Sequence, residues 1–174
     1  MHWSIVLKRN YYREMIKMQK SILDPCCGSR MFYFDKDNPL VLFGDCRVEN
    51  ITMYNGRKLI VDPEQILNVT SLPYEDESFN LVILDPPHLI RAGSKCYMAQ
   101  KYGKLPEDYH TFIKKAFNEC MRVLKSGHTL VFKWNECQIP VKEIIDCIGM
   151  KPLIGNRCGK ASKTHWMVFY KDDT

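Results

Sequence analysis

The sequence predicts an α/β fold with a mostly parallel sheet, because short apolar segments alternate with segments of helical composition. Ser21–Asp24, Leu40–Asp45 and Phe79–Asp85 are apolar runs that each end in an aspartate. Such near-continuous runs are typical of strands that are buried on both faces of a parallel sheet. Pro106–Lys125 and Val141–Ile148 have the pattern of amphipathic helices. With 174 residues, 45% of them hydrophobic, the chain is expected to form one domain over residues 1–174.

Composition and charge exclude several classes of protein. No apolar run approaches the roughly 20 residues of a membrane span. Met1–Ser21 contains five Lys and Arg residues and does not resemble a signal peptide, so a cytoplasmic location is expected. The eight cysteines include no Cys-x-x-Cys pair, and Cys120 and Cys147 fall inside apolar segments as small hydrophobic residues do. We therefore expect no metal site. The net charge of +5 does not identify a partner by itself.

The first strand leads into a turn of small residues. We expect a helix over Tyr11–Lys20, then the strand Ser21–Leu23 and the turn Asp24–Arg30. Small side chains let a ligand approach the backbone, and Gly28 allows the positive φ of a sharp turn. A plain strand–turn–helix corner explains this segment equally well, because nucleotide-binding loops usually have two or three glycines. Ser29–Asp35 leaves room for only a short crossover helix.

The second strand, Leu40–Asp45, ends in an acid about 20 residues after the first turn. In nucleotide-binding βαβ folds, an acid at this distance accepts hydrogen bonds from the two ribose hydroxyls. A solvated aspartate at a strand end is the alternative. The next two segments, Glu49–Tyr54 and Arg57–Val61, flank Asn55-Gly56, which is a strong hairpin signal. The sequence thus predicts a β-hairpin inserted after the second strand.

A third strand is predicted over Ile66–Val69, and Asn68 should end near the same edge of the sheet as Asp45. The strand Phe79–Leu84 then runs into Asp85-Pro86-Pro87-His88 and must stop there, because proline cannot donate a hydrogen bond to the sheet. Asp85 therefore lies at a carboxyl end, where ligands bind in open α/β sheets. The two prolines leave little backbone freedom, so their carbonyl groups point in set directions.

The segment after His88, Leu89–Leu105, is basic and aromatic. It contains Arg91, Lys95, Lys101 and Lys104 but no acid, and Tyr97 and Tyr102 are interleaved with them. Cations and aromatic rings together suit a polyanion whose bases stack, whereas the alternative is a solvated basic loop. We call this segment the basic loop.

The C-terminal third continues the alternation. After the helix Pro106–Lys125 we expect a strand over Thr129–Trp134, the helix Val141–Ile148, and a pair of strands over Pro152–Ile154 and His165–Tyr170. Lys133 and Trp134 end the fifth strand on the same edge as Asp85, which favours a substrate-side role. For Trp134, a place in the core is an equally good interpretation.

Taken in order, these motifs resemble the class I S-adenosylmethionine-dependent methyltransferases, specifically the amino-methyltransferases with an Asp-Pro-Pro-aromatic motif. Asp24–Gly28 resembles the cofactor loop, Asp45 the ribose acid and Asn68 the adenine-contacting position, while Asp85-Pro86-Pro87-His88 resembles the catalytic motif. The small form is similar to methyltransferases encoded by bacteriophages. The chain differs from the family pattern in its single loop glycine, in Asn68 where an acid is common, and in His88 where Tyr, Phe or Trp is usual.

The resemblance implies a Rossmann-like methyltransferase sandwich with a mostly parallel seven-stranded sheet, a C-terminal antiparallel strand and the hairpin insertion. It implies S-adenosylmethionine as the cofactor, bound by Asp24, Pro25, Cys26, Gly28, Asp45, Cys46, Asn68 and Val69. The catalytic residues would be Asp85, Pro86, Pro87 and His88. The substrate would be held by Arg91, Lys95, Lys101, Lys104, Lys133 and Trp134.

The expected substrate is an exocyclic amino group of a nucleic-acid base, in the first place adenine in DNA, and the chain is expected to act as a monomer or homodimer. An exocyclic nitrogen is a poor nucleophile while its lone pair is delocalised into the ring, so acceptors such as Asp85 and the Pro86 carbonyl would favour the pyramidal form that attacks the methyl group. His88 would stack on the base. An RNA base, a protein glutamine and a cofactor-binding module without turnover remain as alternatives.

Overall fold

Seven strands form the main sheet in the described part of the chain, which in this computed structural model comprises residues 20–53, 55–93, 96–156 and 162–173. The order across the sheet is β5-β2-β1-β6-β7-β9-β8. The strands are β1 (Ile22–Asp24), β2 (Val41–Asp45), β5 (Gln65–Ile66), β6 (Phe79–Leu84), β7 (Leu124–Asn135), β8 (Ile154–Gly155) and β9 (Thr164–Tyr170). The predicted helix Tyr11–Lys20 lies almost entirely outside the described residues.

The pairing confirms the predicted fold class. β1 pairs in parallel with β2 and β6, and the parallel sheet continues through β5 on one side and β7 on the other. β9 runs antiparallel to both β7 and β8. The predicted hairpin is also present, as an antiparallel pair of β3 (Glu49–Thr52) and β4 (Lys58–Val61) that forms a sheet of its own. Gly56 in its turn has φ +77°, as the Asn55-Gly56 signal predicts.

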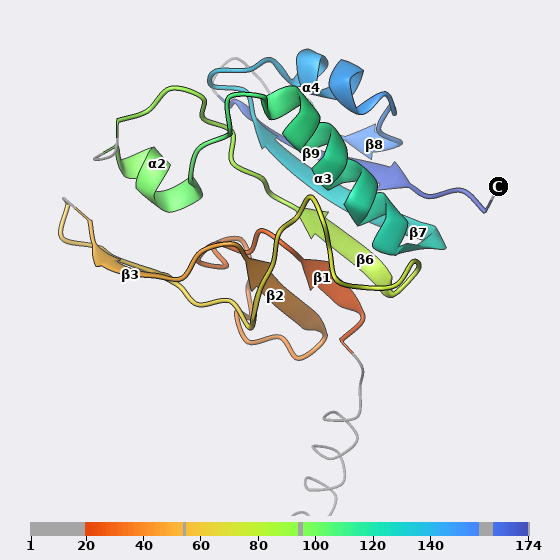
Figure 1. Cartoon of the computed structure of the whole chain (residues 1–174), viewed down its shortest axis with the longest axis horizontal. Helices are drawn as coiled ribbons and strands as arrows, with labels where there is room; N and C mark the ends of the chain where they lie inside the picture. Colours follow the sequence, from red (N-terminus) through yellow and green to blue (C-terminus); the bar gives the residue numbers. More distant parts are fainter. Residues whose placement is uncertain (1–19, 54, 94–95, 157–161, 174) are drawn as a thin grey trace, which may run out of the picture.

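The strand order reverses at β1. From β1 the chain builds β2 and β5 on one side, and it then returns to place β6 and β7 on the other side. The carboxyl ends of β1 and β6 therefore flank a topological switch point, where loops diverge and leave a crevice. In Figure 1 the arrowheads of β1, β2 and β6 point toward the side from which the hairpin and α2 (Tyr97–Tyr102) project.

Two helices, α3 (Tyr109–Val123) and α4 (Val141–Ile148), lie on the same face of the sheet (Figure 1). Asp108 caps the N-terminus of α3, because its carboxylate accepts a hydrogen bond from the backbone N–H of Thr111 at 3.1 Å. Its buried stripe follows the helical period and packs on the sheet, with Phe117 4.9 Å from Phe169 between ring centroids. None of the helices in the described residues has the length and apolar character that a membrane crossing requires.

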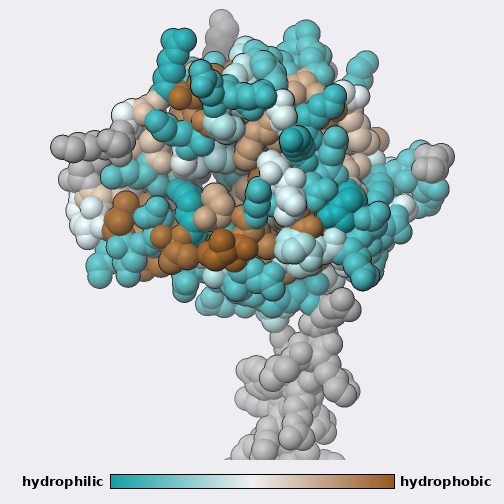
Figure 2. Space-filling model, viewed as in Figure 1, coloured by the Kyte–Doolittle hydropathy of each residue, from teal (hydrophilic) through white to brown (hydrophobic). Residues whose placement is uncertain are grey.

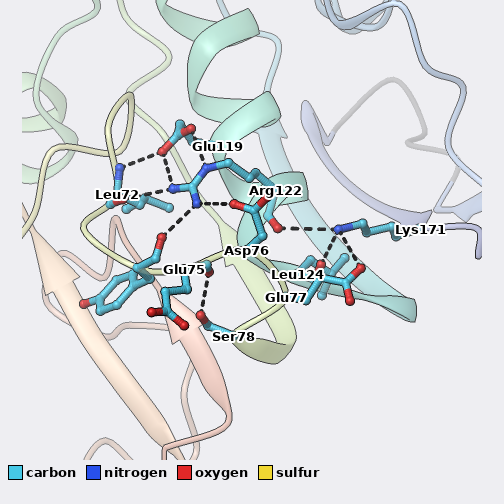
Figure 3. A network of polar contacts seen from close by, with 10 residues as sticks. Leu72, Glu75, Asp76, Glu77, Ser78, Glu119, Arg122, Leu124 and Lys171 are labelled. Carbon is cyan, nitrogen blue, oxygen red and sulfur yellow. Dashed lines mark hydrogen bonds and ion pairs between the residues drawn. The ribbon is translucent and has the colours of Figure 1, made fainter.

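An ionic network secures the loop that precedes β6 (Figure 3). The guanidinium of Arg122, on α3, donates to the carbonyl oxygens of Leu72 and Tyr74 and to the carboxylates of Asp76 and Glu119 at 2.7–3.0 Å. Glu119 also accepts from the backbone N–H of Leu72 at 2.8 Å. A planar guanidinium with five donors can hold several acceptors in one arrangement. The network therefore fixes the loop from which β6 starts, and β6 in turn leads to Asp85.

The predicted crossover helix Ser29–Asp35 is wrong, because residues 25–40 consist of turns. Gly28 and Arg30 both have positive φ, and the side chains of Asp35 and Asn38 bind backbone N–H groups two residues ahead, which competes with helix formation. The apolar ring of Tyr33 instead packs on a small cluster of Cys27, Val41 and Phe43.

Other boundaries also differ. The third strand is β5, Gln65–Ile66, rather than Ile66–Val69, so Asn68 and Val69 lie in the loop after it. α3 starts at Tyr109 instead of Pro106 and ends at Val123, where β7 begins directly. The basic loop contains the short helix α2, which the sequence pattern did not predict.

Candidate functional site

A pocket opens at the carboxyl edge of the sheet, beside the switch point. It encloses about 850 Å³ of space outside protein atoms, part of it open to solvent. Its walls come from the segments after β1, β2, β5 and β6, and the segment from α2 to the start of α3 closes it. A pocket with mostly apolar walls and a few polar groups suits a small-molecule ligand.

Asp45 ties the turn after β1 to the end of β2. Its carboxylate accepts a hydrogen bond from the backbone N–H of Gly28 at 2.9 Å, from the backbone N–H of Arg47 at 3.0 Å and from Arg47 Nε at 3.3 Å. Gly28 has φ +50°, a conformation that favours glycine. An ionised carboxylate has about four acceptor positions, so the protein already uses three of those on Asp45.

Asp24 is fully buried and does not line the pocket. It accepts hydrogen bonds from the Tyr33 hydroxyl at 2.9 Å and from the backbone N–H of Cys26 at 3.2 Å. Burial raises the pKa of this carboxyl to about 8, although the hydrogen bonds from Tyr33 and Cys26 oppose the rise. In this arrangement Asp24 stabilises the turn after β1 through its hydrogen bonds to Cys26 and Tyr33 and does not face the pocket.

Asp85 forms a partly buried ion pair with Lys133. Lys133 Nζ, on β7, donates to Asp85 Oδ2 at 2.6 Å, and the two side chains are 15% and 11% exposed. Burial raises the pKa of Asp85, and the positive charge of Lys133 counteracts that rise. Asp85 Oδ1 makes no hydrogen bond to any described residue and remains available at the pocket wall.

Aromatic rings surround the Lys133 ammonium group. Its Nζ lies 5.4 Å from the ring centroids of Phe32 and Tyr102 and 5.7 Å from that of Trp166. A cation over aromatic faces is stabilised by about 0.5–2 kcal/mol. The rings thus enclose the ammonium group of Lys133 next to Asp85.

His88 and Trp134 are core residues. His88 is 3% exposed, with its ring 5.1 Å from that of Tyr102 and 6.5 Å from that of Trp134. Burial lowers the pKa of His88 to about 4, so the imidazole is neutral near pH 7. Trp134 is 1% exposed and donates to the Ile139 carbonyl at 3.1 Å. This burial agrees with the interpretation of Trp134 as a core residue, and Trp134 does not line the pocket.

The structure brings most of the sequence-predicted residues to one pocket. Those that line it are Pro25, Cys26, Gly28, Asp45, Cys46, Asn68, Val69, Asp85, Pro87, Lys101 and Lys104. Pro86 and His88 are buried beneath it, and Lys133 joins it through Asp85. Arg91 stays apart, since its backbone is held by the side chain of Gln138. Lys95 lies outside the described residues.

Several pocket residues were missed by sequence reasoning, among them Phe32, Arg47 and Phe112. Arg47 is the most informative, because it contacts Asp45 and also donates from Nη1 to the Gln100 carbonyl of α2 at 3.3 Å. It therefore connects the end of β2 to the basic loop. Its position two residues after a strand-end acid was the only signal in the sequence, and many surface arginines share that pattern.

Neither a metal-binding cluster nor a sequence relative indicates what this site binds. No group of three or more His, Cys, Asp or Glu side chains placed to hold a metal ion occurs within the described ranges. A scan against models of known protein families gives no match. A search of curated proteins gives none either.

Solved structures with a similar fold are methyltransferases by their descriptions. One is a putative S-adenosylmethionine-dependent methyltransferase of Methanococcus maripaludis, with a TM-score of 0.34 and 18% identity over 62% of this chain; the match spans 53%, about half, of that protein. A second, an S-adenosylmethionine-dependent methyltransferase of Leishmania major, has a TM-score of 0.48 and 12% identity over 93% of this chain and 70% of its own. The antibiotic-resistance methyltransferase Kmr has a TM-score of 0.41 and 13% identity, over 92% of this chain and 91% of its own. At these values the likenesses assign no function to this chain.

Proposed function

We propose that this chain is an S-adenosylmethionine-dependent methyltransferase that acts on an exocyclic amino group of a nucleic-acid base, in the first place adenine in DNA. The observation that carries the proposal is the position of Asp85-Pro86-Pro87. The motif follows β6 at the switch point, and Asp85 and Pro87 line the same pocket as Gly28, Asp45 and Asn68. The Asp85 acceptor thus lies in the wall of a crevice at the switch point, and the Pro86 carbonyl directly follows it in the chain.

The residues after β1, β2 and β5 fit a nucleoside-containing cofactor. The turn at Gly28 offers a close backbone approach, since a side-chain carbon built there would meet no atom within 4 Å. Asp45 supplies a carboxylate at the pocket wall, and Leu67 and Val69 supply apolar surface. When bound, the cofactor supplies an electrophilic methyl group on a sulfonium. Because Arg47 occupies acceptor positions on Asp45, a ribose would have to displace at least its Nε contact.

Asp85 is suited to accept a hydrogen bond rather than to remove a proton. One carboxylate oxygen accepts a hydrogen bond from Lys133, and the other, at the pocket wall, has no partner within the described part of the chain. An amino group bound there would donate to Oδ1, while the Pro86 carbonyl would accept the second hydrogen in the manner implied by the family resemblance. These acceptors draw the nitrogen toward a pyramidal shape with a localised lone pair. The methylated product is cationic and acidic, so its proton can leave to water afterwards.

Lys133 acts on this chemistry through Asp85 and is a positioning residue. Without it, the buried carboxyl would shift toward its neutral form, which donates a hydrogen bond instead of accepting one. The aromatic rings of Phe32, Tyr102 and Trp166 hold the ammonium group where it can oppose that shift.

Tyr102 takes the stacking role that the family resemblance gives to His88. The His88 ring is enclosed in the core, whereas Tyr102 lines the pocket together with Asp85. An aromatic plane that stacks on a base contributes about 1–3 kcal/mol to binding. A base in a duplex would first have to flip out of the helix, which costs a few kcal/mol that such contacts help to offset.

Methyl transfer from tritiated S-adenosylmethionine to duplex DNA, single-stranded DNA, RNA and protein tests the proposal. We expect label in DNA with the parent chain and at least roughly a hundredfold less with Asp85→Ala. Label in RNA or protein alone would move the substrate to one of those classes. If no acceptor is labelled although S-adenosylhomocysteine binds, the chain is a cofactor-binding module without turnover on these polymers.

A further inference from the structure

A second groove adjoins the pocket on the side of the hairpin. It runs between the turn after β1, the β3–β4 hairpin and α2. Gly28, Ser29, Met31 and Lys101 line both the groove and the pocket, so the two hollows are continuous. A polymer that places one residue in the pocket can therefore extend into the groove. We call it the hairpin groove.

The hairpin groove carries a large share of the net positive charge of the chain. Its lining contains five cations, Arg30, Lys36, Arg57, Lys58 and Lys101, and two carboxylates, Asp37 and Asp62, which gives +3 against +5 for the whole sequence. Cations gathered along a concave surface attract a polyanion.

Arg30 already has structural partners. It donates to the carbonyl oxygens of Lys36 and Asp62 and to the Asp37 carboxylate, and its guanidinium lies 4.0 Å from the Phe43 ring centroid. It thereby offsets Asp37. By contrast, Lys36, Arg57 and Lys58 are exposed and form no ion pair with any described residue. Three cations are thus left for a ligand.

The hairpin is held in place over the groove by its own apolar cluster. Met53, Leu59 and Val61 are buried together, and Ile51 and Tyr97 pack against them. Since Tyr97 belongs to α2, this cluster joins the hairpin to the basic loop. The alternation along β4 turns Lys58 outward while Leu59 and Val61 point inward. Ile60 of β4 and Val48, just before β3, are exposed, and Figure 2 shows an apolar band toward the hairpin side of a mostly hydrophilic face.

Lys101 stands between the two hollows. Its ammonium group lies 5.4 Å from the Tyr97 ring centroid and 5.3 Å from that of Tyr102, and it lines both the pocket and the groove. A cation placed where a target residue would enter the pocket is suited to the phosphate next to that residue.

We propose that the hairpin groove binds the phosphodiester backbone of the nucleic-acid strand whose base enters the pocket. The inference rests on the proposed function for the choice of polymer, and it assigns to the hairpin, rather than to the basic loop alone, the wall that holds the strand. Lys36, Arg57 and Lys58 contact phosphates, and Lys101 contacts the phosphate nearest the target base.

The triple variant Lys36→Ala, Arg57→Ala, Lys58→Ala tests this inference in the full chain. Nucleic-acid affinity is measured against salt concentration with labelled duplex and single-stranded DNA. If three phosphate contacts are lost, the slope of log K against log salt should flatten by about 2.7 for a duplex and about 2.1 for a single strand. Affinity at about 0.1 M salt should fall at least roughly tenfold. Affinity for S-adenosylhomocysteine should stay within about twofold, because none of the three residues lines the pocket.

A matched control removes three exposed lysines outside the pocket and the groove: Lys114→Ala, Lys115→Ala, Lys151→Ala. It makes the same change in net charge and should leave the slope nearly unchanged. Equal slopes and affinities for the groove variant, the control and the parent would overturn the groove assignment while methyl transfer by the parent still supports the proposed function. If the parent binds DNA through the groove but methylates no base, the groove stands and the proposed function fails. If the parent binds no nucleic acid, both fail.

Discussion

Asp45 ends β2 and Asp85 directly follows β6, and both line one pocket, but their hydrogen-bonding partners differ in kind. Two of the three donors to Asp45 are backbone N–H groups, which the chain holds in fixed positions. Among the described residues, Asp85 has a single hydrogen-bonding partner, the side chain of Lys133, and its Oδ1 makes no hydrogen bond. The comparison indicates that Asp45 is built into the scaffold, whereas Asp85 is kept charged and partly free. We read the first as a binding group and the second as the group that meets the reacting atom.

The largest expected effect is on turnover, and it comes from changing Asp85, the residue whose Oδ1 is unpaired among the described residues. Asp85→Ala removes the preorganised acceptor and should lower kcat at least roughly a hundredfold. Affinity for S-adenosylhomocysteine should persist, because Asp45 and the turn at Gly28 are untouched. Steady-state kinetics and calorimetry measure the two quantities. Near-full turnover by the variant would remove Asp85 from the mechanism, and a large loss of cofactor affinity would mean that the two sides of the pocket are not separate.

Asp45→Ala tests whether Asp45 is a cofactor-binding group. A charge-assisted hydrogen bond is worth about 1.5–3 kcal/mol, so affinity for S-adenosylhomocysteine should fall by roughly 10- to 150-fold. The variant also frees the N–H of Gly28, so thermal unfolding is monitored in parallel, and Asp45→Asn serves as the milder comparison because it keeps an acceptor without the charge. Unchanged cofactor binding by Asp45→Ala would place the ribose elsewhere.

Lys133→Met tests whether Lys133 keeps the carboxyl group of Asp85 ionised. Because burial raises the pKa of Asp85 and Lys133 opposes that effect, removing Lys133 should raise the pKa further. The rate depends on the carboxylate form and is lost as pH falls through this pKa, so the acid limb of the kcat profile should move to higher pH. Each unit of movement lowers the rate about tenfold below the pKa. Lys133→Arg keeps the charge and should return the limb toward the parent position.

Removing one partner of a buried pair costs about 3–5 kcal/mol, so the stability of Lys133→Met is measured first. If the folded variant has less activity but an unshifted acid limb, Lys133 only supports the structure.

Asp24 offers a smaller effect, on stability alone. Its pKa is about 8 when folded, against about 4 in an unfolded chain, so the folded state binds the extra proton between these values. The free energy of unfolding should therefore fall as pH rises through this window, by up to about 1.4 kcal/mol per pH unit from this group. His88 acts in the opposite direction, because its pKa is about 4 when folded and about 6.5 when unfolded, so it removes stability as pH falls through that range.

The difference in unfolding free energy between Asp24→Asn and the parent isolates the first effect. Denaturant titrations at several pH values should show that difference growing in favour of the variant as pH rises from about 4 to 8. A difference independent of pH would mean that Asp24 is ionised in the folded protein.

The sequence predicted strand ends better than it predicted side-chain directions. Asp24, Asp45 and Asp85 all close strands as expected, because an apolar run stopped by a turn or by prolines leaves few other arrangements. The burial of the polar residues at these strand ends could not be read from the sequence. Asp24 is the last residue of β1 and is buried, as is Leu23 before it, so alternation does not bring it to the surface. His88 is buried beyond the end of β6, where the alternation of a strand no longer applies.

Contacts between distant segments were also beyond sequence reasoning. The ammonium group of Lys133 faces Phe32 and Trp166 because β7 pairs with β9 and the turn after β1 folds across them, and no local pattern encodes that meeting. The helix expected over Ser29–Asp35 failed for a local reason, since side chains there bind nearby backbone groups instead. The hairpin was predicted, but its packing on Tyr97 of α2 depends on tertiary contacts.

The position of the transferred methyl group tests the central claim most directly. DNA is incubated with the protein and isotopically labelled S-adenosylmethionine, digested to nucleosides and analysed by mass spectrometry, with Asp85→Ala as the control. The arrangement of Asp85 and Pro86 predicts label on the exocyclic nitrogen of a base, in the first place adenine, and its loss in the control. Label on a ring carbon or ring nitrogen, or equal labelling by the control, would contradict the assignment of Asp85 as the acceptor for an amino group.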